Sequence, residues 1–194
     1  MANLRRLAIY GGASNSAPDS YYAAAARLGT EIAERGLGIV YGGGGVGMMG
    51  ALADGALAAG GEVIGVITEK LFEIEVGHAG LTRLEVVSSM HPRKARMAEL
   101  GDGFIAMPGG WGTLEEIFEA VTWSQLNDHI KPCGLYDVDG FWSGLEAFLD
   151  HVTETGFIRD SHRGLLTCHA EPAALIAALE DQEIPTFGPW IADA

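Results

Sequence analysis

The chain is poor in cysteine and in basic residues, and each shortage excludes a class of protein. Its 194 residues include two cysteines, Cys133 and Cys168, with no CxxC motif, so we exclude a disulfide framework and expect a reducing compartment. Lysine and arginine total 12 against 26 aspartates and glutamates, which gives a formal net charge of -14. Binding the phosphate backbone of nucleic acid requires a basic surplus, so nucleic acid is not an expected partner.

Long hydrophobic runs are also missing. The longest mostly apolar stretch, 48–61, is too short and too rich in alanine and glycine to span a bilayer. The N-terminus leads into a short apolar strand rather than the hydrophobic core of a signal peptide. We therefore expect a cytoplasmic protein with no membrane partner. Hydrophobic residues nevertheless make up 48% of the chain, which is too many for a disordered acidic polymer.

Short β-rich runs alternate with helical patterns along the whole chain. Strands are expected at 7–10, 38–41, 62–67, 84–87, 104–107 and 133–136, with a short closing segment near 165–167. Helices are expected at 19–35, from the first glycine cluster to 59, and at 90–100, 113–126, 141–155 and 171–180. Because the strands are apolar on both faces, this alternation predicts an α/β fold with a parallel sheet and helices on each side.

The length of the chain predicts one domain over residues 1–180, followed by an extended tail over 181–194. Between the third and fourth strands, segment 68–82 has an irregular pattern. It is long enough to suggest a functional loop.

Glycine is abundant and clustered. The chain has 28 glycines, about twice the usual share, gathered at 42–47 and 109–112 with no three-residue period. Both clusters follow predicted strands, and ligands of parallel α/β folds bind beyond the carboxyl ends of strands. Backbone N–H groups in such turns, together with helix N-termini, form anion sites, so we interpret the clusters as a phosphate site. Two tight turns that hold no ligand are the alternative, because glycine adopts positive φ at little cost.

The first cluster also satisfies the dinucleotide pattern G-x-G-x-x-G. Glu69 lies near the end of the next predicted strand, where an acid could bind a ribose hydroxyl. Two features argue against this interpretation. The motif follows the second strand rather than the first, and a dinucleotide site would leave the second cluster without a purpose.

Two adjacent cations, Arg93 and Lys94, begin a predicted helix in this acidic chain. Cations at a helix start oppose the helix dipole unless an anion compensates. A surface pair is the ordinary explanation, but beside two phosphate turns we favour a binding role. A planar guanidinium also suits phosphate or a leaving base better than a lysine does.

The second cluster leads into Thr113-x-x-Glu116, which brings a hydroxyl and a carboxylate to a helix start. The same spacing is that of a capping box, in which Glu116 would bond only to the backbone. Both interpretations stay open on the residues alone. We expect Glu115 and Glu119 to lie on a solvated helix face.

Three motifs together resemble a known family. Residues 108–116 fit PGGxGTxxE, residues 90–94 fit MHxRK, and residues 41–50 fit YGGGxxGLMG with Met48 in place of the usual leucine. In these motifs the sequence resembles the LOG ("Lonely guy") family of cytokinin riboside 5′-monophosphate phosphoribohydrolases, often labelled lysine decarboxylases. The resemblance runs from the Gly-Gly turn near residue 11 through Ile158.

The resemblance implies a Rossmann-like three-layer sandwich with a mostly parallel central sheet and helices on both faces. It also implies a homodimer that needs no cofactor and no metal. The implied reaction is hydrolysis of the N-glycosidic bond of nucleoside 5′-monophosphates, AMP included, to free base and ribose 5-phosphate. The first turn, residues 12–16, departs from the family's usual Gly-Ser-Ser pattern.

The roles of individual residues follow from the same resemblance. The catalytic residues fall on Arg93 and Glu116. A carboxylate near the ribose stabilises the positive charge that develops as the glycosidic bond breaks. The implied substrate contacts are Gly43, Gly44, Gly45, Glu75, Met90, Lys94, Gly109, Gly110, Trp111, Gly112, Thr113, Leu114 and Glu115.

Two other functions are alternatives to hydrolysis. Lysine decarboxylation needs pyridoxal phosphate held on a lysine, and Lys70, Lys94 and Lys131 all lie in contexts that do not suit that role. A sensor of the same fold could bind AMP-like ligands without hydrolysing them. The presence of both Arg93 and Glu116 disfavours the sensor.

Overall fold

The computed structural model describes residues 3–74 and 77–185. The strands, in chain order, are β1 (Arg6–Tyr10), β2 (Gly38–Tyr41), β3 (Val63–Thr68), β4 (Arg83–Val87), β5 (Gly103–Ala106), β6 (Cys133–Tyr136) and β7 (Leu166–His169). The helices are α1 (Asp19–Glu34), α2 (Gly47–Ala58), α3 (Glu69–Ile74), α4 (Met90–Leu100), α5 (Trp111–Gln125), α6 (Ser143–Glu154), α7 (Asp160–Arg163) and α8 (Pro172–Asp181).

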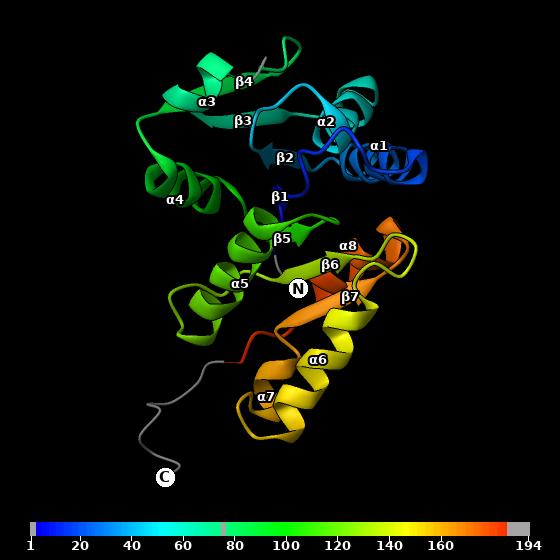
Figure 1. Ribbon diagram of the computed structural model, residues 1–194, viewed down its shortest axis with the longest axis vertical. Helices are drawn as coiled ribbons and strands as arrows, with labels where there is room; N and C mark the ends of the chain where they lie inside the picture. The colour runs from blue at the N-terminus through cyan, green and yellow to red at the C-terminus, as the bar shows by residue number, and fades with distance from the viewer. Residues whose placement is uncertain (1–2, 75–76, 186–194) are drawn as a thin grey trace.

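The strands form one parallel sheet in the order β4-β3-β2-β1-β5-β6-β7 (Figure 1). The chain starts in the middle at β1, moves outward to β4, then returns to β5 on the other side of β1. Leu7 pairs with Ile39 on one side, and Ala8 pairs with Phe104 on the other. This reversal makes a topological switch point at the carboxyl ends of β1 and β5, where sheets of this type bind ligands.

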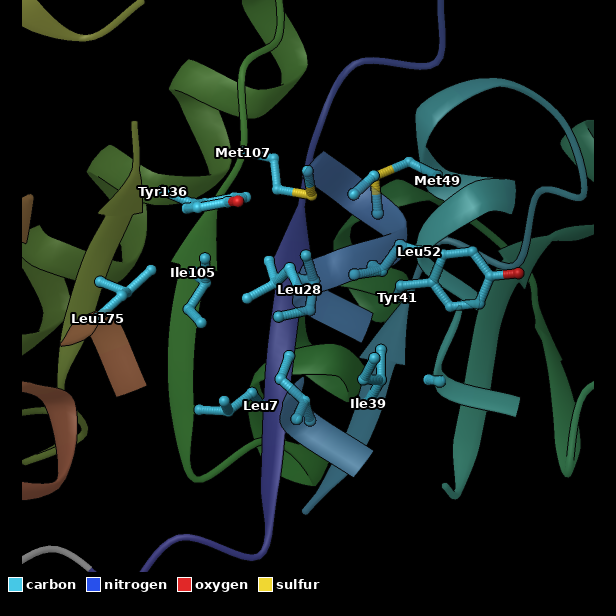
Figure 2. Close-up of a cluster of buried hydrophobic side chains, with 14 of the residues drawn as sticks. Leu7, Leu28, Ile39, Tyr41, Met49, Leu52, Ile105, Met107, Tyr136 and Leu175 are labelled. Carbon is cyan, nitrogen blue, oxygen red and sulfur yellow. The ribbon is translucent and has the colours of Figure 1, made fainter. Parts of the chain in front are cut away.

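Helices cover both faces of the sheet because the strands are apolar on both sides. In β1, Leu7 and Ile9 pack toward α1, α2 and α8, whereas Ala8 and Tyr10 pack toward α4, α5 and α6. Figure 2 shows the first of these two cores, with Leu28 beside β1. The predicted Rossmann-like sandwich is confirmed, and each pair of neighbouring strands in the sheet is parallel.

The structure corrects several predicted boundaries. The loop expected over 68–82 begins with α3, whose first turn is capped by the Thr68 hydroxyl accepting from the Leu71 N–H at 3.2 Å. Helix α5 begins at Trp111 rather than at 113 because extended Gly110 is its N-cap. Helix α6 starts two residues later than 141, and α7 was not expected.

Helix α8 includes Asp181, the first residue of the range expected to form an extended tail, and residues 186–194 of that range lie outside the described residues. Cys133 and Cys168 are both free thiols in the described part of the chain. Within the same ranges, no helix has the length and hydrophobicity that crossing a membrane requires.

Candidate active site

A cavity of about 530 Å³ opens at the carboxyl ends of β1, β2 and β5, at the switch point of the sheet. Its volume lies in the range of small-molecule sites. The described residues that line it are Ile9, Tyr10, Gly11, Gly12, Ala13, Tyr41, Gly42, Gly44, Val46, Met49, Leu71, Arg93, Met97, Gly110, Gly112, Thr113 and Glu116.

Both predicted glycine turns reach this cavity, and each precedes a helix. Gly44 and Val46 lie just before α2, while Gly110 and Gly112 lie at the start of α5. The N-termini of two helices therefore face one cavity, which favours an anionic ligand. Thr113, only 3% exposed, brings its hydroxyl side chain to the same wall.

Hydrogen bonds hold the turns in place. The Gly12 N–H donates to the Pro108 carbonyl at 3.0 Å, which joins the turn after β1 to the turn after β5. The Tyr41 hydroxyl donates to the Gly44 carbonyl, also at 3.0 Å. Because the turns are fixed before any ligand arrives, their N–H groups need little reorganisation to bind one.

Arg93 is anchored beside the cavity by two contacts. Its Nε donates to the Val66 carbonyl on β3 at 2.9 Å, and its Nη1 contacts the Met90 sulfur at 3.4 Å. The side chain is only 15% exposed. These contacts leave the outer edge of the guanidinium directed toward the cavity that it lines.

Glu116 faces Arg93 from the second turn of α5. Since α5 begins at Trp111, Thr113 lies inside the helix, and the capping-box interpretation of Thr113 and Glu116 is wrong. The Glu116 carboxylate instead lies 3.9 Å from Arg93 Nη1, with its side chain 13% exposed. Burial raises the pKa of Glu116 to about 7, although the positive charge of Arg93 acts in the opposite direction. The site therefore holds a carboxyl group that changes charge near neutral pH.

A segment after β3 crosses the first glycine turn. Leu71 on α3 lines the cavity, and the His78 N–H donates to the Gly43 carbonyl at 3.0 Å. An isolated antiparallel bridge pairs Gly44 with Gly77. Glu75, predicted to contact substrate, lies outside the described residues.

Several predicted contact residues lie beside the cavity rather than along it in the described structure. Gly43, Gly45 and Gly109 shape the two turns, and Leu114 packs against the core between the sheet and α5. Met90 contacts Arg93 through its sulfur, whereas Trp111 is 89% exposed.

Lys94 and Glu115 contact each other instead of the cavity. The Lys94 ammonium donates to Glu115 and, at 2.7 Å, to Glu119 Oε2. Glu115 lies on a solvated face as expected, with its side chain 55% exposed, whereas that of Glu119 is only 26% exposed. Both also bind Lys94, a lysine that is only 9% exposed, and this contact was not expected.

Sequence reasoning missed the aromatic and aliphatic lining. Tyr10 and Tyr41 are the last residues of β1 and β2, and both line the cavity. The rule that placed the glycine clusters at strand ends also applies to these tyrosines and could have identified them. Met49, Leu71 and Met97 carry no comparable sequence signal, because they reach the cavity from helices.

Fold and site together define a Rossmann-like α/β protein with a ligand cavity at the switch point of its sheet. The family model described as "possible lysine decarboxylase" matches residues 49–179. The chain belongs to this family, the LOG family. Its members that are about 40% identical to this chain are named as phosphoribohydrolases.

Two relatives illustrate the similarity. "Cytokinin riboside 5′-monophosphate phosphoribohydrolase LOG" from Oryza sativa subsp. japonica is 42% identical over 180 residues, which cover 93% of this chain and 74% of that protein. "Cytokinin riboside 5′-monophosphate phosphoribohydrolase LOG7" from Arabidopsis thaliana is 40% identical over 186 residues, which cover 96% of this chain and 85% of that protein.

Among solved structures, the molybdenum cofactor carrier protein from Chlamydomonas reinhardtii superposes with a TM-score of 0.71 at 24% identity. The match covers 92% of this chain and 97% of that one. At this identity the likeness shows the shared fold.

Proposed function

We propose that this chain is a phosphoribohydrolase that cleaves the N-glycosidic bond of nucleoside 5′-monophosphates, including cytokinin riboside monophosphates and AMP. The observation that carries the proposal is the buried Arg93–Glu116 pair, which lies between two glycine turns at helix N-termini. The names of the relatives agree with this chemistry.

In the proposed reaction the two glycine turns hold the 5′-phosphate. Gly44, Gly110, Gly112 and Thr113 line the cavity where two helix N-termini meet, so their N–H and hydroxyl groups suit a phosphate. The substrate's ribose then lies toward the interior of the cavity, near the charged pair.

Glu116 and Arg93 act on the bond that breaks. As the base leaves C1′, positive charge builds on the ribose, and the ionised Glu116 carboxylate stabilises it and orients the attacking water. Arg93 stabilises the departing base with a guanidinium that Val66 holds in place. Water supplies its oxygen to C1′ and a proton to the base, so the products are free base and ribose 5-phosphate.

The lysines favour hydrolysis over lysine decarboxylation. A Schiff base with pyridoxal phosphate needs a lysine at the site. Lys94 is bound by two carboxylates, and Lys131 Nζ donates to the Ala98 and Gly101 carbonyls at 2.6 and 2.7 Å. Lys70 is exposed on α3, and no lysine is among the described residues that line the cavity.

The deciding experiment incubates the purified protein with AMP, adenosine, ATP and isopentenyladenosine monophosphate and measures free base by chromatography. Base release from the two monophosphates, with at least a hundredfold preference over adenosine, is the expected result, since the turns recognise the phosphate. Thermal stabilisation by AMP without base release would instead identify a nucleotide sensor.

Gly42 provides a test of how Arg93 is placed. A Cβ built at Gly42 would lie 2.2 Å from Arg93 Nη2, so Gly42→Ala must displace the guanidinium. We expect kcat/KM for AMP to fall about 10²-fold, because small misplacements of catalytic groups have effects of this size. Gly144→Ala, on α6 with open space around its Cβ, is the matched control. Equal activity of the two variants would show that the position of Arg93 does not matter.

The proposal also includes a cytoplasmic homodimer. Trp111 and Phe118 are 89% and 37% exposed, and their spacing places them on one face of α5; Leu126, the C-cap of this helix, is 49% exposed. An exposed apolar stripe of this kind is typical of a protein–protein contact. Sedimentation equilibrium should therefore give a mass of about twice 20.4 kDa for the wild type and a monomer for Trp111→Ser/Phe118→Ser. A monomeric wild type would contradict this part of the proposal.

A further inference from the structure

Lys94 carries a buried positive charge to which the proposed reaction gives no role. It follows Arg93 on α4 and is 9% exposed, outside the described lining of the cavity. Its ammonium donates to Glu115 and Glu119 of α5, with 2.7 Å to Glu119 Oε2. We call these three residues the Lys94 clamp.

The clamp surrounds Glu116 along α5. Glu115 precedes Glu116, and Glu119 lies one turn further along the helix, so three carboxylates lie within five consecutive residues. Like charges at this spacing oppose one another's ionisation. Without a nearby cation, Glu115 and Glu119 would therefore favour the protonated form of Glu116.

The other groups that face Glu116 come from α4 and β1. Arg93 lies 3.9 Å away and favours the ionised form. Tyr10, 4% exposed, faces the same side of the sheet, and burial together with the charge of Glu116 raises the pKa of its hydroxyl, so it stays protonated. Tyr10 thus adds no charge to the site at neutral pH.

We propose that Lys94 is a positioning residue: by neutralising Glu115 and Glu119 and tying α4 to α5, it keeps the Glu116 carboxylate anionic and in register with Arg93. The inference rests on the proposed hydrolytic role of Glu116. The role assigned to Lys94 follows from its contacts with Glu115 and Glu119.

The electrostatics of the site agree with this assignment. Burial lowers the pKa of Lys94, but the hydrogen bonds that Lys94 donates to Glu115 and Glu119, together with their negative charges, outweigh burial and raise the pKa overall, so the ammonium stays charged. Burial raises the pKa of Glu116 to about 7, the charges of Arg93 and Lys94 lower it, and those of Glu115 and Glu119 raise it. Because Glu116 is half-ionised near neutrality, a modest change in the clamp alters the anionic fraction substantially.

The test compares the pH dependence of kcat/KM for AMP in four variants and the wild type. Lys94→Met removes the cation, and Lys94→Arg retains it. Lys94→Met/Glu115→Gln/Glu119→Gln removes all three charges of the clamp. Arg5→Gln, at the amino end of the sheet before β1, is the control for losing one positive charge far from the cavity.

We expect Lys94→Met to raise the apparent pKa of the acid limb by about one unit. Its activity then falls about tenfold at pH 6 and stays close to wild type at pH 9. The triple variant and Lys94→Arg should return the limb to its wild-type position or below, and Arg5→Gln should leave it unchanged. The substrate phosphate also titrates near pH 6, equally in every variant, so the difference between variants is the measured quantity.

A second measurement does not depend on turnover. In protein labelled with ¹³C at the glutamate carboxyl carbons, Glu116 is assigned by loss of its signal in Glu116→Gln, and its titration is followed directly. The signal should titrate at higher pH in Lys94→Met and revert in the triple variant. The triple variant still serves if Lys94→Met fails to fold, because it leaves no unpaired buried charge.

The outcomes separate this inference from the proposed function. An active wild type whose Glu116 titration is unmoved by Lys94→Met, with activity lost equally at every pH, would overturn the inference and leave the function standing. A wild type that releases no base would overturn the proposed function, while the carbon titration still decides whether Lys94 controls the ionisation of Glu116.

Discussion

Glu116→Gln should lower kcat for adenine release from AMP about 10²–10³-fold, the usual effect of removing one charge-stabilising contact from a transition state. Glutamine keeps the shape of the side chain in its 13% exposed site but supplies no charge to the ribose. The measurement is the initial rate of base release at saturating AMP and pH 8, where wild-type Glu116 is mostly ionised. Glu99→Gln, an exposed residue on α4 paired with Arg96, is the control and should match the wild type. Wild-type turnover by Glu116→Gln would remove the catalytic assignment.

The same variant should be more stable than the wild type at alkaline pH. Burial raises the pKa of Glu116 from 4.5 to about 7, so the folded protein binds this proton more tightly than the unfolded chain does. The resulting stabilisation is complete below about pH 4.5 and is lost as the pH rises through 7. Above pH 7, the ionised carboxylate costs about 3 kcal/mol relative to a neutral isostere.

Urea unfolding at two pH values checks this expectation. At pH 8 the free energy of unfolding of Glu116→Gln should exceed that of the wild type by about 3 kcal/mol, and the gain should shrink toward zero near pH 4. A gain of equal size at both pH values would contradict a titrating, buried carboxyl group. Together with the kinetics, the expected result would show that the site sacrifices stability for a reactive anion.

Arg93→Ala should lower kcat/KM for AMP about 10²–10³-fold, an effect as large as the loss of Glu116. The variant removes the charge beside the leaving base and also removes the cation that opposes protonation of Glu116. Its activity should therefore fall further at pH 6 than at pH 8, which is measured with the same assay across pH.

Arg93→Lys tests whether charge alone is sufficient. Lysine lacks the Nε that donates to the Val66 carbonyl and the planar fork that could hold a base, so we expect most of the activity to be lost. Arg96→Gln, one turn further along α4 and paired with Glu85, is the matched control and should stay within a few-fold of wild type. Full activity of Arg93→Lys would show that a tethered guanidinium is unnecessary.

The fold was predictable because its causes are local. Strands such as Gly38–Tyr41 and Val63–Thr68 are buried on both faces, and runs of this kind are stable only inside a parallel sheet with helices on each side. The two glycine clusters then mark strand ends, and both reach the cavity. Short elements such as α3 and α7 escaped prediction because a single turn has too little periodicity to detect.

The contacts within the site were less predictable. The Thr113–Glu116 spacing fits a capping box, but α5 begins at Trp111, so Thr113 is inside the helix and cannot be its N-cap. The partners of Lys94 are on another helix, so the spacing of charges along α5 predicted the exposure of Glu115 but not the ion pairs that Glu115 and Glu119 form with Lys94. Tyr10 enters the site because an alternating strand directs it toward α5.

The class of fold and the position of the glycine turns at strand ends could be predicted from hydrophobic period and glycine clustering, which are properties of neighbouring residues. Arg93 and Glu116 became catalytic candidates through motifs that resemble those of the LOG family. Which charges meet depends on tertiary packing. Ion pairs between α4 and α5, and the burial that sets the ionisation of Glu116, arise when separate helices pack on one sheet. The spacing of residues along the chain does not indicate how far apart two such helices lie.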